Sequence, residues 1–208
     1  IPEFPIYIDS PLAISATEIY RRHPECFDRD MNELRAAGES PFDFPGVSYA
    51  RRTEESIALN TVSGAMIVSA SGMANAGRIK HHLKHNLWRE ESTILFVGFQ
   101  AAGTLGRRLV DGAKTVTLFG EEIAVNARVE TLPGFSAHAD RKGLLNWLEH
   151  VEGLNRAFIV HGEESQSLAF ADLVRSSLGI HADVPNSGDT VELGPDGSVS
   201  WVSGGERP

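Results

Sequence analysis

The sequence has one cysteine, Cys26, among 208 residues. It cannot form an internal disulfide, which is typical of a protein from a reducing compartment, so we expect a cytoplasmic location. It also lacks any run close to the roughly 18 apolar residues that a transmembrane helix needs, and no signal peptide opens it. Secreted disulfide-rich domains and membrane-spanning proteins are therefore excluded, and no membrane partner is expected.

Basic residues are scarce as well. The formal net charge is −9, whereas a domain that binds nucleic acid through diffuse electrostatics is normally basic. A polyanionic ligand must therefore be held at a local site. Hydrophobic residues form 41% and charged residues 23% of the sequence, which is ordinary for a globular protein. Because the sequence opens on Ile1, without Met and close to a strand candidate, we interpret it as a piece of a longer protein.

The order of short apolar runs predicts the fold class. Runs of β-branched or aromatic residues alternate with longer segments of helical periodicity, which is typical of βαβ units and a parallel sheet. The first strand candidates, each leading into a helix candidate, are 6–8, 47–49, 66–69 and 94–98. From about Thr115 the rhythm changes. The later candidates are strands at 116–119, 123–129 and 158–160, helices around 142–150 and 168–178, and short strands near Val191 and Val199. We therefore predict an α/β fold in which a second substructure begins near that point.

Two glycine-bearing turns follow the third and fourth strand candidates, at 69–78 and 98–107. Their small and hydroxyl residues would leave backbone N–H groups free to bind an anion where each following helix begins. In a parallel sheet both turns would lie at the carboxyl edge, where open α/β sheets bind ligands. Ordinary strand-to-helix turns with good caps remain an equally open interpretation.

Two nucleotide-binding motifs are disfavoured at these turns. Gly72 and Gly77 have the spacing of a Walker A loop, but Arg78 and Ile79 replace its Lys-Ser/Thr pair. Gly103 and Gly106 do not fit the dinucleotide pattern G-x-G-x-x-G. A P-loop NTPase and a nicotinamide site are therefore unsupported.

Histidines occur in two settings. His81 and His85 have the i, i+4 spacing of a metal pair, but we favour a solvated basic face there, made of Arg78, His81, His82, Lys84 and His85. His138 and His161 each follow an extended segment in the second substructure. Either one alone would more often be structural. Together they are candidates for a metal ligand or a proton donor.

Five motifs, in this order, resemble the signatures of β-CASP ribonucleases of the metallo-β-lactamase superfamily. They are Ile-Asp-Ser-Pro-Leu-Ala at 8–13, Ser-Gly-Met at 71–73, Gly-Phe-Gln-Ala-Ala-Gly-Thr-Leu-Gly-Arg at 98–107, Phe-Ser-Ala-His-Ala-Asp at 135–140 and Val-His-Gly-Glu at 160–163. Together they span nearly the whole chain, which makes the set far more specific than any single motif. The chain looks most similar to bacterial and archaeal RNA-processing enzymes related to the cleavage and polyadenylation endonuclease.

The resemblance implies an architecture and a set of roles. A Rossmann-like, parallel-sheet β-CASP cassette would occupy 1–120, and 121–208 would be the returning, RNA-metabolising part of a metallo-β-lactamase domain. His138 would be catalytic, assisting protonation of the leaving group, and His161 would be a zinc ligand in a two-zinc site. A histidine at the position of His161 is typical of members that act on RNA rather than DNA. The implied substrate-binding residues, along the path of the RNA phosphates, are Ser71, Gly72, Met73, Arg78, Gly103, Thr104, Arg107 and Ser136.

One departure from the family limits these expectations. No H-x-H-x-D-H run occurs, although that run supplies most ligands of the two-zinc site. We therefore expect zinc to be absent or weakly bound, the chain alone to lack nuclease activity, and a missing N-terminal metallo-β-lactamase half to be its partner. Surface meant for that half would be exposed, with self-association as the result. The residues expected on that surface are Phe135, Leu144, Leu145 and Trp147.

Two other functions remain open from the residues. The first is a non-catalytic α/β module that binds nucleotides or phosphate, which the composition and the two turns allow equally well. The second is a scaffold domain whose turns are only good helix starts. RNA as partner and substrate is the interpretation that the resemblance adds.

Overall fold

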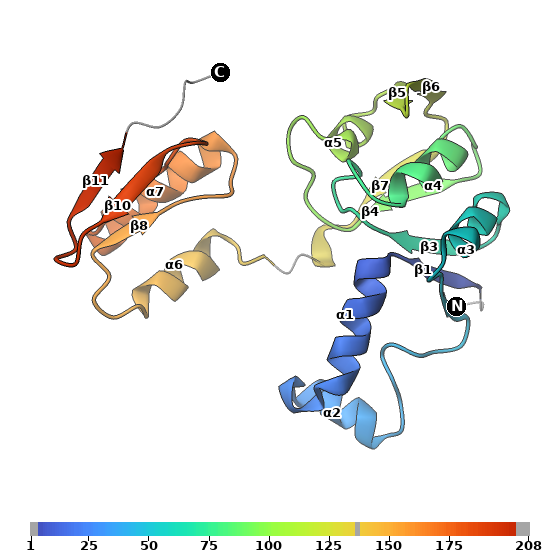
Figure 1. Ribbon diagram of the computed structural model, residues 1–208, viewed down its shortest axis with the longest axis horizontal. Coiled ribbons are helices and arrows are strands. Elements are labelled where there is room, and N and C mark those ends of the chain that lie inside the picture. The colour runs from blue at the N-terminus through green and yellow to red at the C-terminus, as the bar shows by residue number, and fades with distance from the viewer. Residues whose placement is uncertain (1–3, 136–137, 203–208) are drawn as a thin grey trace. The chain divides into compact units, whose positions relative to one another are not determined.

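The computed structural model describes residues 4–135 and 138–202. The chain forms two compact units, Ile1–Ser136 and Ala137–Pro208, which Figure 1 colours from blue to yellow and from yellow to red. Both combine helices with small sheets, so the predicted α/β class is confirmed at that level. Across the two described ranges, no helix is both long and apolar enough to cross a bilayer.

The first unit opens with a three-stranded parallel sheet in the order β2-β1-β3. Its elements are β1 (Ile6–Asp9), α1 (Pro11–Arg22), α2 (Arg29–Ala36), β2 (Val47–Tyr49), α3 (Thr53–Ala58) and β3 (Met66–Ser69), with short 3-10 turns at Pro24–Cys26 and Leu59–Thr61. Ile6 pairs with Val47 on one side and with Met66 on the other. As the sequence predicts, α1 is capped by Ser10, whose Oγ accepts the Ala13 N–H at 3.3 Å.

The rest of the first unit builds two further strand pairs. Its elements are α4 (Ile79–Asn86), β4 (Thr93–Phe96), α5 (Leu105–Val110), β5 (Thr115–Leu118), β6 (Glu121–Ala124) and β7 (Arg128–Thr131), ending in a 3-10 turn at Pro133–Phe135. β4 and β7 are parallel, whereas β5 and β6 form an antiparallel hairpin. One buried cluster joins Leu83 of α4 and Leu87, its C-cap, to Leu109, Val116 and Leu118. This core fixes where both glycine-bearing turns lie.

The second unit is smaller and also combines helices with pairs of strands. Its elements are α6 (Arg141–Glu149), β8 (Arg156–Phe158), α7 (Glu164–Leu178), β9 (His181–Asp183), β10 (Thr190–Leu193) and β11 (Val199–Val202). β8 and β9 are parallel, and β10 and β11 are antiparallel. α7 packs on the first pair through Ala171 and Val174, and it ends at Gly179, whose left-handed φ of +68° suits a residue without Cβ.

The structure differs from the sequence prediction in three places. α2 and β9 were not predicted, because α2 has few apolar residues and β9 is only three residues long. The expected strand at 123–129 is divided between β6 and β7. The expectation that both turns leave one parallel sheet is wrong, since β3 and β4 belong to different sheets.

Candidate functional site

The two glycine-bearing turns contact each other directly, although their strands belong to different sheets. The amide Nε2 of Gln100, in the second turn, donates to the Gly72 carbonyl in the first at 2.9 Å. The Leu105 N–H donates to Asn75 Oδ1 at 2.8 Å, and the Gly106 N–H donates to the Met73 carbonyl at 3.1 Å. The turns therefore form one substructure, which will be called the paired turns, residues 70–78 and 98–107.

These contacts use the N–H groups that were expected to be free at the start of α5. Leu105 and Gly106 donate to the first turn, and the Arg107 N–H donates to Thr104 Oγ1 at 3.1 Å. The expectation of free donors is therefore wrong at this helix. The physical reason is that a neighbouring loop lies close enough to supply acceptors, and buried backbone donors almost always take a protein acceptor when one is in reach.

The first turn is also closed on itself. Ser71 Oγ donates to the Ala76 carbonyl at 3.2 Å and accepts the Ala76 N–H at 3.3 Å. Gly77 has a φ of +79°, and a Cβ there would overlap the Ala70 carbonyl oxygen. Met73 Sδ accepts the Ala101 N–H at 3.3 Å. Several predicted substrate-binding residues, namely Ser71, Gly72, Met73 and Thr104, therefore hold the paired turns together, and their contact with substrate stays a prediction.

Arg78, predicted to face substrate phosphates, is instead directed into the protein. Its Nη1 donates to Asp9 Oδ1 at 2.6 Å and to the Ala50 carbonyl at 2.9 Å, and its Nη2 donates to the Arg51 carbonyl at 3.2 Å. The Arg78 side chain is only 19% exposed. This geometry favours a structural role, because the guanidinium joins α4 to the end of β1 and to the segment after β2.

Asp9 is the centre of a buried polar cluster that comprises Asp9, Ser56, Arg78 and His82. The Asp9 side chain is fully buried, and its Oδ2 accepts from Ser56 Oγ and from His82 Nε2, each at 2.6 Å. A carboxylate can only accept, so His82 Nε2 carries the proton of that bond. Burial alone would raise the pKa of the Asp9 carboxyl, but the hydrogen bonds from Ser56, His82 and Arg78 outweigh it and lower that pKa.

The buried position of His82 corrects the sequence interpretation of α4. His82 was expected on a solvated basic face, but it is only 5% exposed. The i, i+4, i+8 pattern of Ile79, Leu83 and Leu87 was correct, and the buried stripe is simply wider than these three residues. The missed signal was Asp9 itself, a carboxylate at the end of an apolar strand, which needs buried partners.

The remaining predicted residues of the first unit are more exposed. Arg107 Nε lies 2.9 Å from both carboxylate oxygens of Asp111 on α5. Gly103 has a φ of +79° and lines a small cavity beside α4 and β5. His81 stacks on Phe119, with ring centroids 4.6 Å apart. Ser136, the eighth predicted substrate-binding residue, lies outside the described residues.

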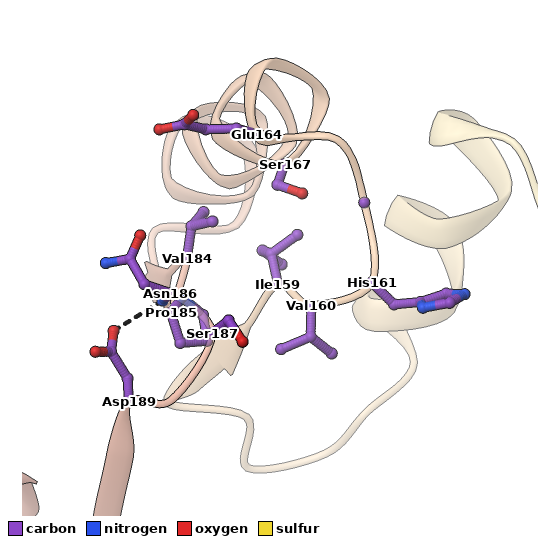
Figure 2. A pocket seen from close by; sticks show the side chains of 11 residues that line it. Ile159, Val160, His161, Glu164, Ser167, Val184, Pro185, Asn186, Ser187 and Asp189 are labelled. Carbon is purple, nitrogen blue, oxygen red and sulfur yellow. Dashed lines mark hydrogen bonds between the residues drawn. The ribbon is translucent and has the colours of Figure 1, made fainter. Parts of the chain in front are cut away.

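In the second unit, His161 lies at a cavity of about 560 Å³ between the loop after β8, the start of α7 and the loop after β9. Its backbone has a φ of +64°, a left-handed conformation that is costly for a residue with a Cβ and that often marks a functional position. Figure 2 shows the imidazole pointing away from Asn186 and Asp189. The imidazole therefore projects away from these two side chains, and neither supplies an oxygen ligand to it.

Gly162, which follows His161 in its motif, is also positioned by packing. A Cβ on Gly162 would lie 2.6 Å from Ser167 Oγ, so glycine lets the loop approach α7 closely. His138, the predicted catalytic residue, is exposed and precedes α6, which is capped by Asp140 accepting the Gly143 N–H at 2.7 Å. Both predicted histidines therefore belong to the second unit, and each lies three residues before the start of a helix.

The donor set for zinc is incomplete in the described part of the chain. No group of three or more His, Cys, Asp or Glu side chains there is arranged to hold a metal ion. A structural or catalytic zinc site needs at least three protein ligands in close proximity. His161 alone therefore does not fit a zinc site.

Three of the four apolar side chains that were expected to be exposed are so. They are Phe135 in the first unit, and Leu144 and Trp147 on α6 of the second unit. Leu145 is less exposed, because it packs on the buried cluster of α7, β8 and β9. The helical phase of α6 explains the difference, since Leu144 and Leu145 point about 100° apart on the helix.

Comparison with known proteins agrees with this arrangement. A family model described as the Beta-Casp domain matches residues 1–109, and one described as the Zn-dependent metallo-hydrolase RNA specificity domain matches residues 122–185. Together they account for most of both compact units.

Curated relatives give the same result. Ribonuclease TTHA0252 of Thermus thermophilus is 41% identical over 175 residues, which cover 84% of this chain and 40% of that protein. Transcription termination factor FttA of Pyrococcus horikoshii is 35% identical over 201 residues, covering 92% of this chain and 30% of that protein. The chain thus spans less than half the length of these relatives. It belongs to the β-CASP family of the metallo-β-lactamase superfamily.

Proposed function

We propose that this chain is the substrate-binding portion of a zinc-dependent ribonuclease, which hydrolyses phosphodiester bonds during RNA processing or decay in the cytoplasm. In this proposal residues 1–120 are a Rossmann-like β-CASP cassette, and 121–208 are the returning part of the metallo-β-lactamase domain. β7 pairs with β4 within the first compact unit, so this is a boundary between family domains rather than between compact units.

The observation that carries the proposal is the backbone of His161. His161 lies three residues after β8 in a left-handed conformation that costs roughly 1–2 kcal/mol, and such backbone strain is concentrated at functional positions. The match to an RNA specificity domain over the same residues supports RNA as the substrate. His161 would be one zinc ligand, and the other ligands would come from the N-terminal half that the relatives' length allows for.

The roles of the other predicted residues follow from their positions. His138, exposed before α6, would assist protonation of the leaving group in the complete enzyme. Gly103 and Arg107 are the predicted substrate-binding residues that face outward from the paired turns. Ser71, Gly72, Met73 and Thr104 would present that surface by holding the two turns together, with Arg78 supporting α4 from inside.

Two measurements on the purified chain test this function. End-labelled single-stranded RNA should be bound but not cleaved when Zn²⁺ is supplied, because His161 alone cannot assemble the metal centre. Titration calorimetry with Zn²⁺ should show weak binding or none. Robust metal-dependent cleavage by the chain alone, or no affinity for RNA, would contradict the proposal.

A non-catalytic scaffold or nucleotide-binding module is the competing function. The internal engagement of the Leu105, Gly106 and Arg107 N–H groups favours a scaffold and counts against a nucleotide-binding module, since these donors cannot also bind a phosphate. Calorimetry with short RNA against mononucleotides separates the two. Binding of mononucleotides as tight as that of RNA supports the module, and tighter binding of RNA supports the ribonuclease.

The exposed apolar residues of α6 lead to a second prediction from the proposed function. Leu144 and Trp147 would be covered by the missing half in the complete protein, so the chain alone should self-associate through them. Analytical ultracentrifugation should show a dimer or larger species that Trp147→Lys shifts toward monomer. A monomer at high concentration in the unaltered chain would argue against it.

A further inference from the structure

A small cationic cavity lies beside the paired turns, on the first unit. Its volume is about 230 Å³, and it is lined by Ala74, Asn75, Lys80, Gly103, Leu105, Arg108, Thr117 and Leu118. Lys80 and Arg108 bring two positive charges to it. Among the described residues, neither makes an ion pair with a carboxylate, whereas Lys84 is paired with Glu121 and Arg107 with Asp111. In a chain of net charge −9, two such cations at one cavity form a local site for an anion.

The cavity continues into an aromatic surface. The Nζ atom of Lys80 lies 4.8 Å from the centroid of the Phe119 ring. The same ring stacks on His81 at 4.6 Å, with an angle of 27° between the planes. Phe119 is nevertheless 49% exposed. Lys80 therefore belongs both to the cavity and to the ring pair, and the two are contiguous.

Phe119 lies at a turn position whose backbone conformation disfavours a large side chain. Leu118 pairs with Glu121, so Phe119 and Gly120 form the two-residue turn of the β5–β6 hairpin. Their φ values are +52° and +81°. Turns with two positive φ values favour Asn-Gly, and an aromatic residue there is strained. A strained, half-exposed aromatic side chain in a hairpin turn points to binding.

The acidic neighbours of this surface limit what it can bind. Glu122 is the cross-strand partner of Thr117, so its side chain is on the same face of the hairpin as the cavity-lining Thr117. That carboxylate repels anions, so the attraction of Lys80 and Arg108 alone is not enough to bind one. An anionic ligand is favoured only if other parts of it also contact the surface. The adjoining Phe119 and His81 rings supply such contacts for a ligand that carries both a phosphate and a flat base.

We propose that this surface is an accessory site for single-stranded RNA, in which Lys80 and Arg108 hold a phosphate and the Phe119–His81 pair stacks an adjacent base. The proposal rests on the proposed function and adds to it a contact outside the family motifs. The cavity is smaller than the roughly 300 Å³ at which ligand pockets usually begin, so it suits a phosphate rather than a whole nucleotide. Duplex RNA is disfavoured, because its paired bases are not available to stack on side chains.

The test is the affinity of the chain for a labelled single-stranded oligouridylate, measured by fluorescence anisotropy, together with its melting temperature. Phe119→Asn should weaken binding by roughly tenfold, the scale of one lost base–aromatic contact. The same variant should melt no lower than the unaltered chain, because Asn-Gly suits the turn better. Phe119→Trp should retain the affinity, since its ring can still stack.

Charge variants separate phosphate binding from general electrostatics. Lys80→Gln and Arg108→Gln should each weaken binding and make the affinity less dependent on salt. Arg29→Gln is the matched control: it makes the same charge change on α2, where Arg29 is beside Asp30 and Glu33, and it should leave the affinity unchanged. Glu122→Gln should strengthen binding, because it removes the repelling carboxylate.

The outcomes distinguish this site from the function as a whole. If the unaltered chain does not bind RNA, both the proposed function and this site are wrong. If it binds RNA but Phe119→Asn and Lys80→Gln bind as tightly as the unaltered chain, only the accessory site is wrong. A lower melting temperature of Phe119→Asn with unchanged affinity would make Phe119 a packing residue and also overturn the proposal.

Discussion

The Nε2 atom of His82 lies 2.6 Å from Oδ2 of Asp9, and both side chains are buried. This bond joins α4 to the end of β1, two elements separated by 73 residues in the chain. The other Asp9 oxygen accepts from Arg78 on the same side of α4. Asp9 is thus the common acceptor that joins the end of β1 to α4 and to Arg78, the last residue of the first of the paired turns.

Asp9→Asn should be strongly destabilising. The amide cannot accept from all of its present donors, and it leaves the Arg78 guanidinium without its carboxylate, so we expect a loss of roughly 3–5 kcal/mol in the free energy of unfolding. Urea denaturation measures this loss. Glu33→Gln is the control, because its pairing with Arg29 at 3.4 Å is exposed and should contribute almost nothing. Equal losses in the free energy of unfolding for the two substitutions would show that Asp9 is not central to the buried cluster.

Low pH should reduce the free energy of unfolding of the unaltered chain, partly through protonation of Asp9. Its pKa is lowered in the folded state from the ordinary value of 3.8, so its charge stabilises the fold above that value. This contribution is lost as the pH falls from about 3.8 through the lower, folded pKa. The stability difference between the unaltered chain and Asp9→Asn should therefore shrink over that range. Urea denaturation at a series of pH values measures it, and a constant difference would show that Asp9 does not titrate as described.

Gly77→Ala should disrupt the first of the paired turns. Two costs combine: a positive φ of +79°, and overlap of the new Cβ with the Ala70 carbonyl oxygen. Gly38→Ala is the matched control, since it has a φ of +80° and open space around it. We expect Gly38→Ala to cost about 1–2 kcal/mol and Gly77→Ala roughly 3 kcal/mol. Equal losses would mean that the turn can move away from the carbonyl at no cost.

Gly106→Ala should separate the paired turns. Alanine is the better helix former by about 1 kcal/mol, but its Cβ would overlap Gln100 Oε1 and displace the amide that binds the Gly72 carbonyl. We therefore expect a net loss of roughly 1–2 kcal/mol and faster hydrogen exchange of the Leu105 and Gly106 amides. Gly98→Ala has open space and is the control. Unchanged exchange in Gly106→Ala would show that Gln100 does not hold the turns.

Much of this organisation follows from local patterns. The strand candidates at 6–8, 47–49 and 66–69 coincide with β1, β2 and β3, and Ser10 and Pro11 open α1 as expected. These features depend on neighbours within a few residues, where periodicity and capping rules apply. The order of five motifs was enough to identify the family, because it needs no knowledge of packing.

The side-chain partners did not follow from local patterns. Arg78 and His82 fall on the polar side of α4 by sequence, and both are directed inward because Asp9, distant in the chain, is buried beside them. The turn N–H groups were expected to be free, and they donate to the neighbouring turn instead. A polar group takes whichever partner the packing brings near, and that partner is set by long-range contacts.

The first three strands, the Ser10 cap of α1 and the family could therefore be predicted from residues that are neighbours in the chain. Only the tertiary structure decides which basic side chains are buried and which remain exposed to a ligand. It placed Arg78 against Asp9, and it left Lys80 and Arg108 together at a cavity beside the exposed ring of Phe119. The reason is that the direction of a charged side chain depends on the carboxylates and aromatic rings that distant segments bring within hydrogen-bonding or stacking distance.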